Sequence, residues 1–108
     1  MTTHFAWVAV APAAEVPDGS VLGVEADGVA LAVFNIDGVL HAYERWCPHR
    51  AGDLCGATIY EGAVVCPDHF WRFDLMTGEC RTSASRPLDR YPVRVVDGIV
   101  EVSVDKPL

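Results

Sequence analysis

The chain has 108 residues, 51% of them hydrophobic, which predicts one domain (residues 1–108) with a real core and disfavours disorder. Eight Lys and Arg against fifteen Asp and Glu give a net charge of −7, and no basic cluster with interleaved aromatic residues occurs. We therefore expect neither nucleic acid nor an anionic membrane as a partner. An acidic surface suits transient docking on basic patches of other proteins, although solubility alone explains the charge equally well.

The N-terminal residues 5–10 are apolar, but no Lys or Arg precedes them and the run is short for a signal peptide. We expect a first β-strand there. No apolar run reaches the roughly 20 residues that a membrane span needs. The expected location is the cytoplasm, where paired cysteines tend to bind metal rather than form disulfides.

Runs rich in β-branched residues surround three Asp-Gly pairs along the chain. Residues 20–26 and 29–34 flank the first pair, residues 39–43 follow the second, and residues 91–96 and 99–104 flank the third. Asp-Gly between apolar runs is a strong hairpin signal, because glycine tolerates the positive φ of a type I′ turn. With no helical periodicity over ten or more residues, the pattern predicts an all-β antiparallel sandwich or barrel.

The region from about residue 45 to residue 87 differs from its flanks. It holds all four cysteines and two of the four histidines, with irregular Gly and Pro punctuation. Strands are expected at residues 63–65 and 71–75, followed by a turn at residues 76–79. We predict a smaller lobe, about residues 45–87, inserted into the β framework.

Two short motifs in this lobe each join a cysteine to a histidine. Cys47-Pro48-His49 is followed, after sixteen intervening residues, by Cys66-Pro67-Asp68-His69. Each motif offers a soft thiolate and a neutral imidazole where a strand gives way to a loop, so two loops can face each other across a metal site. The proline after each cysteine fixes φ and helps to hold its loop open.

These motifs carry a resemblance to a known family. The stretches 47–50 and 66–74 resemble the Rieske ferredoxin family, and residues 86–95 are similar to its closing segment. With the hairpins, the resemblance covers nearly the whole chain and implies a Rieske-like β fold whose inserted lobe binds one [2Fe–2S] cluster. It implies further that Cys47 and Cys66 bind one iron and that His49 and His69 bind the other. Neutral histidine ligands raise the reduction potential into the Rieske range, roughly −150 to +300 mV.

Other chemistries use the same ligand types. A structural Cys₂His₂ zinc site, in a zinc-stabilised interaction module, is one alternative, but its usual grouping is Cys-Cys followed by His-His. A catalytic Cys–His pair is a less favoured interpretation, because a single nucleophile does not need two similar pairs.

The chain departs from the high-potential Rieske proteins of respiratory complexes. Those proteins brace the cluster with a disulfide between the ligand loops, whereas here Asp68 and a residue near Gly52 occupy those positions. Cys55 and Cys80 lie elsewhere and are expected to be small buried thiols.

Trp71 and Phe73 stand where those relatives place Ser and Tyr hydroxyls against the cluster sulfurs. We therefore predict a potential in the lower half of the range. Phe70 follows the second ligand histidine, where most relatives have Gly, and in this it is similar to ferredoxins of toluene-type diiron monooxygenases. With Trp46 and Trp71 it would form a docking patch. The alternative is that the two tryptophans pack over the cluster and exclude water, which we expect for Trp46, whereas both roles stay open for Trp71. His4 and His41 have no partner motif and are expected to be framework residues.

Because nothing beyond the cluster domain is present, the chain is expected to be an electron carrier and not an enzyme. The resemblance implies a monomeric ferredoxin that takes one electron from an NAD(P)H-dependent flavoprotein reductase to a terminal oxygenase of aromatic catabolism. The alternative within the family is the small Rieske subunit of a larger reductase, such as assimilatory nitrite reductase.

Overall fold

The computed structural model describes residues 6–48, 52–67, 70–82, 86–105 and 107–108. Within these ranges lie ten strands and two single-turn 3₁₀ helices: β1 (Val8–Pro12), η1 (Ala13–Glu15), β2 (Val21–Ala26), β3 (Val29–Ile36), β4 (Val39–Glu44), η2 (Leu54–Gly56), β5 (Thr58–Tyr60), β6 (Ala63–Val65), β7 (Arg72–Asp74), β8 (Arg90–Tyr91), β9 (Val93–Val96) and β10 (Ile99–Val102). Every pairing between these strands is antiparallel, which confirms the predicted all-β antiparallel class. In the described part of the chain, no helix is both long and apolar enough to cross a membrane.

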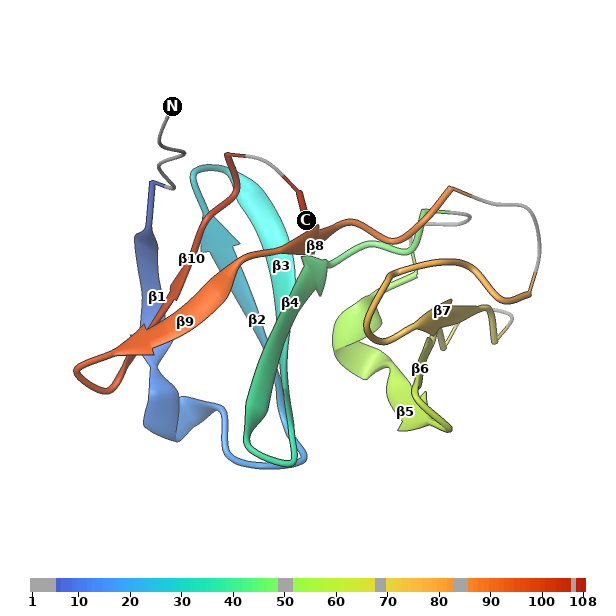
Figure 1. Ribbon diagram of the computed structural model, residues 1–108, viewed down its shortest axis with the longest axis horizontal. Coiled ribbons are helices and arrows are strands. Elements are labelled where there is room, and N and C mark those ends of the chain that lie inside the picture. The colour runs from blue at the N-terminus through green and yellow to red at the C-terminus, as the bar shows by residue number, and fades with distance from the viewer. Residues whose placement is uncertain (1–5, 49–51, 68–69, 83–85, 106) are drawn as a thin grey trace.

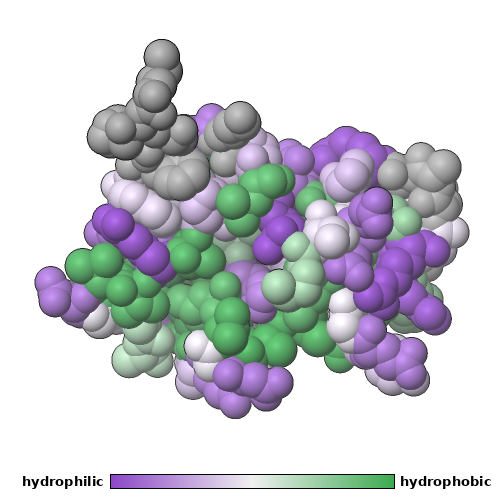
Figure 2. Space-filling model, viewed as in Figure 1, coloured by the Kyte–Doolittle hydropathy of each residue, from purple (hydrophilic) through white to green (hydrophobic). Residues whose placement is uncertain are grey.

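The strands form three sheets, with the orders β1-β10-β9, β2-β3-β4-β8 and β5-β6-β7. The first two sheets make up the β framework, on the left of Figure 1, and the third, with η2, makes up the small lobe on the right. Figure 2 shows hydrophobic side chains gathered over the framework, whereas hydrophilic ones dominate the small lobe in that view.

Strand β3 lies between two cores. Leu31 and Val33 belong to the core between the two framework sheets, and Ala32 and Phe34 belong to the core shared with the small lobe. Because successive side chains of a strand point to opposite faces, this alternation buries all four residues, none of them more than 3% exposed. The small lobe therefore packs on the outer face of the four-stranded sheet.

The three predicted hairpins are confirmed, because the Asp and Gly of each pair both have positive φ: 49° and 80° at Asp27-Gly28, 55° and 87° at Asp37-Gly38, and 51° and 77° at Asp97-Gly98. Type I′ turns require this conformation. A fourth turn of the same kind, Glu61-Gly62, joins β5 to β6 with φ of 49° and 72°, and was not predicted.

Most predicted strands agree with the observed ones to within two residues at each end, but two differ by more. The strand expected over residues 91–96 is split at Pro92: Tyr91 in β8 pairs with β4, whereas β9 pairs with β10 in the other sheet. Proline lacks the amide donor that a continuous ladder needs, so the chain changes sheets at this point. The first strand, expected over residues 5–10, runs from Val8 to Pro12 with an irregular register between Ala9 and Ala11.

Candidate metal centre

Cys47 and Cys66 stand at the necks of two loops in the small lobe. The amide of Cys47 donates a 2.8 Å hydrogen bond to the carbonyl of Gly52, and the amide of Cys66 donates one of the same length to the carbonyl of Trp71. Cys66 follows directly on β6. Each cysteine thus stands at the start of a loop, and its amide is hydrogen-bonded to the residue at the far end of that loop.

Both side chains enter the same buried core. Cys47 is 2% exposed and Cys66 is fully buried, among Leu54, Val64 and Phe73. All four cysteines of the chain lie in the described ranges, and none of them is joined in a disulfide. Two buried thiols that form no disulfide are the soft donors that an iron–sulfur cluster requires. These residues therefore fit the thiolate half of a [2Fe–2S] site.

The predicted histidine ligands, His49 and His69, lie outside the described residues, as does Asp68. Within the described ranges, no three His, Cys, Asp or Glu side chains gather into a metal-binding group. The four-residue ligand set therefore stays a prediction, of which the cysteine pair is the described part.

An ion pair braces the first loop. Arg45 donates from Nε to Oδ1 of Asp53 at 3.1 Å and from Nη2 to Oδ2 at 3.0 Å. The same Oδ1 accepts the amide of Cys55 at 2.9 Å, and the amide of Leu54 donates to the carbonyl of Arg45 at 2.8 Å. The hydrogen bonds from Arg45 hold the pKa of Asp53 below its usual value. This brace spans the loop where the respiratory relatives use a disulfide, and the sequence analysis missed it.

A second ion pair ties the strand after the second loop to the β5–β6 turn. Asp74 accepts the amides of Met76 and Thr77 at 2.9 and 3.0 Å, and its Oδ2 accepts Nη2 of Arg81 at 2.7 Å. Arg81 also donates to the carbonyl of Glu61 at 3.1 Å. These hydrogen bonds, chiefly that from Arg81, lower the pKa of Asp74 to about 2, so the carboxylate stays charged at neutral pH.

Tyr43 and Arg86 attach the small lobe to the framework. The hydroxyl of Tyr43 donates to the carbonyl of Leu75 at 2.5 Å, and burial raises the pKa of Tyr43 well above its usual value. Arg86 donates to both carboxylate oxygens of Glu44, at 2.8 and 2.7 Å, and the amide of Asp89 donates to the same carboxylate at 2.7 Å. Strand β4 therefore holds both the turn after β7 and the exit of the lobe.

The aromatic side chains near the loops divide into exposed and packed ones. Phe70 is 71% exposed and Trp46 is 47% exposed, whereas the partly buried Trp71 packs against the core that contains both cysteines. The prediction that Trp46 packs over the cluster is therefore wrong: its ring lies 5.1 Å from the guanidinium carbon of Arg45 and remains largely open to solvent. Of the two roles left open for Trp71, its partial burial against this core favours packing.

Phe70 has a φ of 58°, in the left-handed region that glycine adopts without strain. A glycine at this position would adopt the same conformation without strain. The exposed Phe70 remains available for a docking patch.

The described cysteines and histidine outside the two motifs pack into the fold. Cys55 and Cys80 are only partly buried, less than expected, but both pack against the core of the small lobe. His41 is 8% exposed and stacks on Tyr43 with 6.3 Å between ring centroids, which agrees with a framework role. His4 lies outside the described residues.

Comparison with known proteins identifies the class of this fold and site. The family described as "Rieske [2Fe-2S] domain" matches residues 6–92. The ferredoxin component of the naphthalene 1,2-dioxygenase/salicylate 5-hydroxylase systems of Ralstonia sp. is 29% identical over 90 residues, which cover 82% of this chain and 86% of that protein. The biphenyl dioxygenase ferredoxin subunit of Pseudomonas sp. (strain KKS102) is 35% identical over 83 residues, covering 75% of this chain and 76% of that protein.

A solved structure gives the same answer. The similar chain comes from a structure described as a complex of reduced oxygenase and oxidised ferredoxin in carbazole 1,9a-dioxygenase. It superposes with a TM-score of 0.83 and 29% identity, and the match covers 97% of this chain and 99% of that chain. This chain belongs to the Rieske [2Fe–2S] domain family. Within it, the relatives confirm the prediction of an electron-transfer ferredoxin rather than an enzyme, and they favour neither the nitrite reductase subunit nor the zinc module. The likeness to the monooxygenase type in particular stays a prediction.

Proposed function

We propose that this ferredoxin holds one Rieske [2Fe–2S] cluster through Cys47 and Cys66 on one iron and His49 and His69 on the other. The observation that carries the proposal is the pair of buried cysteine side chains at the starts of two loops, each followed by a histidine two or three residues along the chain. When bound, such a cluster supplies reversible one-electron transfer.

The residues of the lobe hold and shield the thiolates. Burial of Cys47 and Cys66 keeps water from the sulfur atoms, while the Arg45–Asp53 pair holds the first loop closed. Phe73 is fully buried in the same core and offers no hydroxyl to a cluster sulfur. A site with fewer donors to the sulfurs stabilises an added electron less, which supports a potential in the lower half of the Rieske range.

The proposed electron donor is an NAD(P)H-dependent flavoprotein reductase, and the proposed acceptor is a terminal oxygenase of an aromatic-ring system. Relatives that are ferredoxin components of such systems, and a ferredoxin solved together with its oxygenase, support these partners. The exposed Phe70 and Trp46, close in sequence to the proposed ligands, would form the docking patch at the cluster end. A chain with four cysteines and no disulfide among them suits a cytoplasmic location, and weak redox encounters suit a monomer.

The ligand set is tested by matched substitutions in the purified full chain. Alanine at Cys47, His49, Cys66 or His69 should abolish the visible and EPR spectra of a Rieske cluster, with loss of bound iron. Alanine at Cys55, Cys80 or His41 supplies the same residue types outside the motifs and should leave both spectra in place. A normal cluster in the His49 or His69 variant, or a colourless protein that contains zinc, would contradict the proposal.

The direction of electron flow is tested separately. The loaded protein should be reduced by an NADH-dependent ferredoxin reductase and reoxidised by a terminal oxygenase in single-turnover measurements. Copurification in a stable complex with a nitrite reductase would favour the alternative subunit function.

A further inference from the structure

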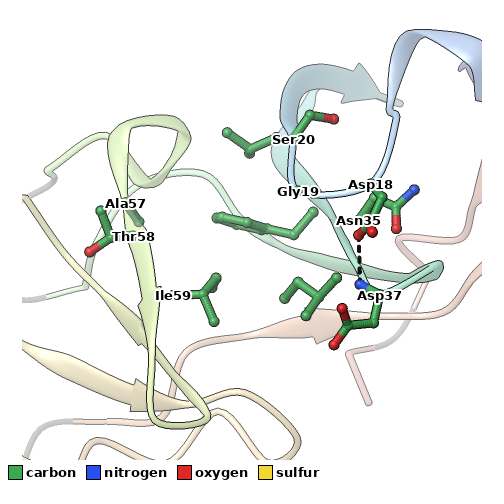
Figure 3. Close-up of a pocket in the computed structure, with 11 residues that line it drawn as sticks. Asp18, Gly19, Ser20, Asn35, Asp37, Ala57, Thr58 and Ile59 are labelled. Atoms are coloured by element: carbon green, nitrogen blue, oxygen red, sulfur yellow. Dashed lines mark hydrogen bonds between the residues drawn. The ribbon is translucent and has the colours of Figure 1, made fainter.

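A groove of about 430 Å³ separates the β framework from the small lobe, away from the cysteine loops in sequence. Residues 18–21 and 34–37 line it from the framework, and residues 57–59 line it from the lobe. Figure 3 shows the side chain of Ile59 and the carboxylate of Asp37 turned toward the space between the two walls. Among the described residues, neither Cys47 nor Cys66 lines it, so the proposed function gives the groove no role.

The surface inside the groove is apolar at its base. Phe34, 3% exposed, and the half-buried Val21 and Ile36 line the framework side, and Ile59, 36% exposed, faces them from β5. Such a surface favours contact with aliphatic carbon rather than with water.

The framework wall is held rigid by hydrogen bonds around Asn35. The side-chain amide of Asn35 donates to the carbonyl of Val16 at 2.8 Å, and its Oδ1 accepts the amide of Gly38 at 2.9 Å. The amide of Asp37 donates to Oδ1 of Asp18 at 2.8 Å, drawn as a dashed line in Figure 3. The carboxylate of Asp18 is therefore held beside the turn that carries Asp37, which lowers the entropic cost of binding.

The charges at the rim of this wall have no counter-ion among the described residues. Arg45, Arg81, Arg86 and Arg94 form their ion pairs with acids elsewhere, and no ion pair involves Asp18 or Asp37. An apolar base with two exposed carboxylates at one rim matches a long cationic side chain, whose aliphatic part covers apolar surface while its head group meets the carboxylates. A planar guanidinium suits paired carboxylate oxygens better than an ammonium does.

We propose that this groove receives an arginine side chain that protrudes from a protein partner of the ferredoxin. The arginine stem lies over Phe34 and Ile59, and its guanidinium pairs with Asp37 and with the free oxygen of Asp18. The inference rests on the proposed function only in that the partner is a redox protein. The groove then gives that partner a second contact, separate from the docking patch of Phe70 and Trp46.

The test uses a minimal probe and the full, cluster-loaded chain. Acetyl-Leu-Arg-Leu-amide is titrated into ¹⁵N-labelled protein, and acetyl-Leu-Gln-Leu-amide serves as the uncharged control. Saturable shifts of the amides of residues 18–21, 34–37 and 57–59 with the arginine peptide alone are expected. Equal shifts with the glutamine peptide, or shifts spread over the acidic surface, would overturn the proposal.

Variants provide a matched control for charge. Asp37→Asn keeps the turn, because asparagine also accepts positive φ, and it should weaken binding of the arginine peptide about three- to five-fold. Asp27→Asn removes one equal charge from the same kind of turn outside the groove and should leave the affinity unchanged. An equal loss in both variants would mean that net charge alone attracts the peptide and would sink the inference.

The same preparation separates the two proposals. A protein that binds the arginine peptide in the groove but is not reduced by a ferredoxin reductase retains this inference and loses the proposed function. A protein that passes electrons normally but shows no groove binding loses this inference alone.

Discussion

Gly78 lies so close to Leu88 that a Cβ atom on Gly78 would stand 2.3 Å from the carbonyl oxygen of Leu88. The two residues are joined by a 2.7 Å hydrogen bond from the amide of Leu88 to the carbonyl of Gly78. This contact packs the turn after β7 directly onto the chain that leaves the small lobe. Only glycine fits there, both for its φ of 78° and for the missing side chain.

We expect Gly78→Ala to lower the free energy of unfolding by more than about 3 kcal/mol, because the new methyl group collides with backbone rather than with a movable side chain. Gly98→Ala is the matched control, since Gly98 has nearly the same φ of 77° but nothing within 4 Å of a Cβ. It should cost about 1 kcal/mol for the backbone strain alone. Equal losses of the two variants in urea unfolding would contradict the contact.

Breaking the brace of the first loop should loosen the cluster. Asp53→Asn removes the charged partner of Arg45, whose side chain is partly exposed, so we expect only a small change in the unfolding midpoint. The cluster absorbance should nevertheless decay several-fold faster under chelator. Glu101→Gln breaks the comparable Arg94 pair in the framework and should leave the decay rate unchanged, whereas equal decay in both variants would refute the brace.

Acid should destabilise the protein partly through His41. Burial, and then the nearby Arg90 charge, lower the pKa of His41 below the usual 6.5, so the unfolded chain binds a proton more readily than the folded one. Stability linked to this group is therefore complete above pH 6.5 and falls as the pH drops below it. Urea unfolding of His41→Gln should show a weaker pH dependence between about pH 5 and 7.5 than the parent protein; an unchanged slope would exclude His41 as the cause.

Phe70→Gly should separate docking from stability. Glycine removes the strain of the left-handed conformation but adds freedom to the unfolded chain, so the free energy of unfolding should change by less than about 1 kcal/mol. The cluster spectrum should persist, while electron transfer to the oxygenase slows. Unchanged transfer would remove Phe70 from the docking patch.

A hydroxyl placed beside the thiolates should raise the reduction potential. Phe73→Tyr restores the residue type found at this position in high-potential relatives, and a donor to sulfur stabilises the added electron. A redox titration should show a more positive midpoint than the parent protein. Because Phe73 is fully buried, urea unfolding of the same variant shows whether the hydroxyl is accommodated.

Sequence reasoning located the features that depend on local chemistry. The Asp-Gly hairpins were predictable because both residues of a type I′ turn need positive φ. Glu61-Gly62 adopts the same turn but was missed, since glutamate carries no turn preference. The break of residues 91–96 at Pro92 could in principle be predicted from the proline. Which strand pairs with each half depends on the tertiary fold.

In the candidate site, too, the features set by local chemistry were predictable, whereas those set by the tertiary fold were not. The positions of Cys47 and Cys66 followed from their motifs, because thiol donors next to histidines at loop starts have few other uses. The brace from Arg45 to Asp53 connects residues eight apart across a loop, and only the folded path brings them together. The exposure of Trp46 could not be read from its residue type, which favours burial.

The burial of β3 on both faces limits how the molecule can be divided. Ala32 and Phe34 on β3, with Tyr43 on β4, form one wall of the core that contains Cys47 and Cys66. A fragment cut out at residues 45–87 would leave that wall behind and open the thiols to solvent. The small lobe therefore cannot be transplanted alone: a chimera that carries it must also contain β3 and β4, on which it packs.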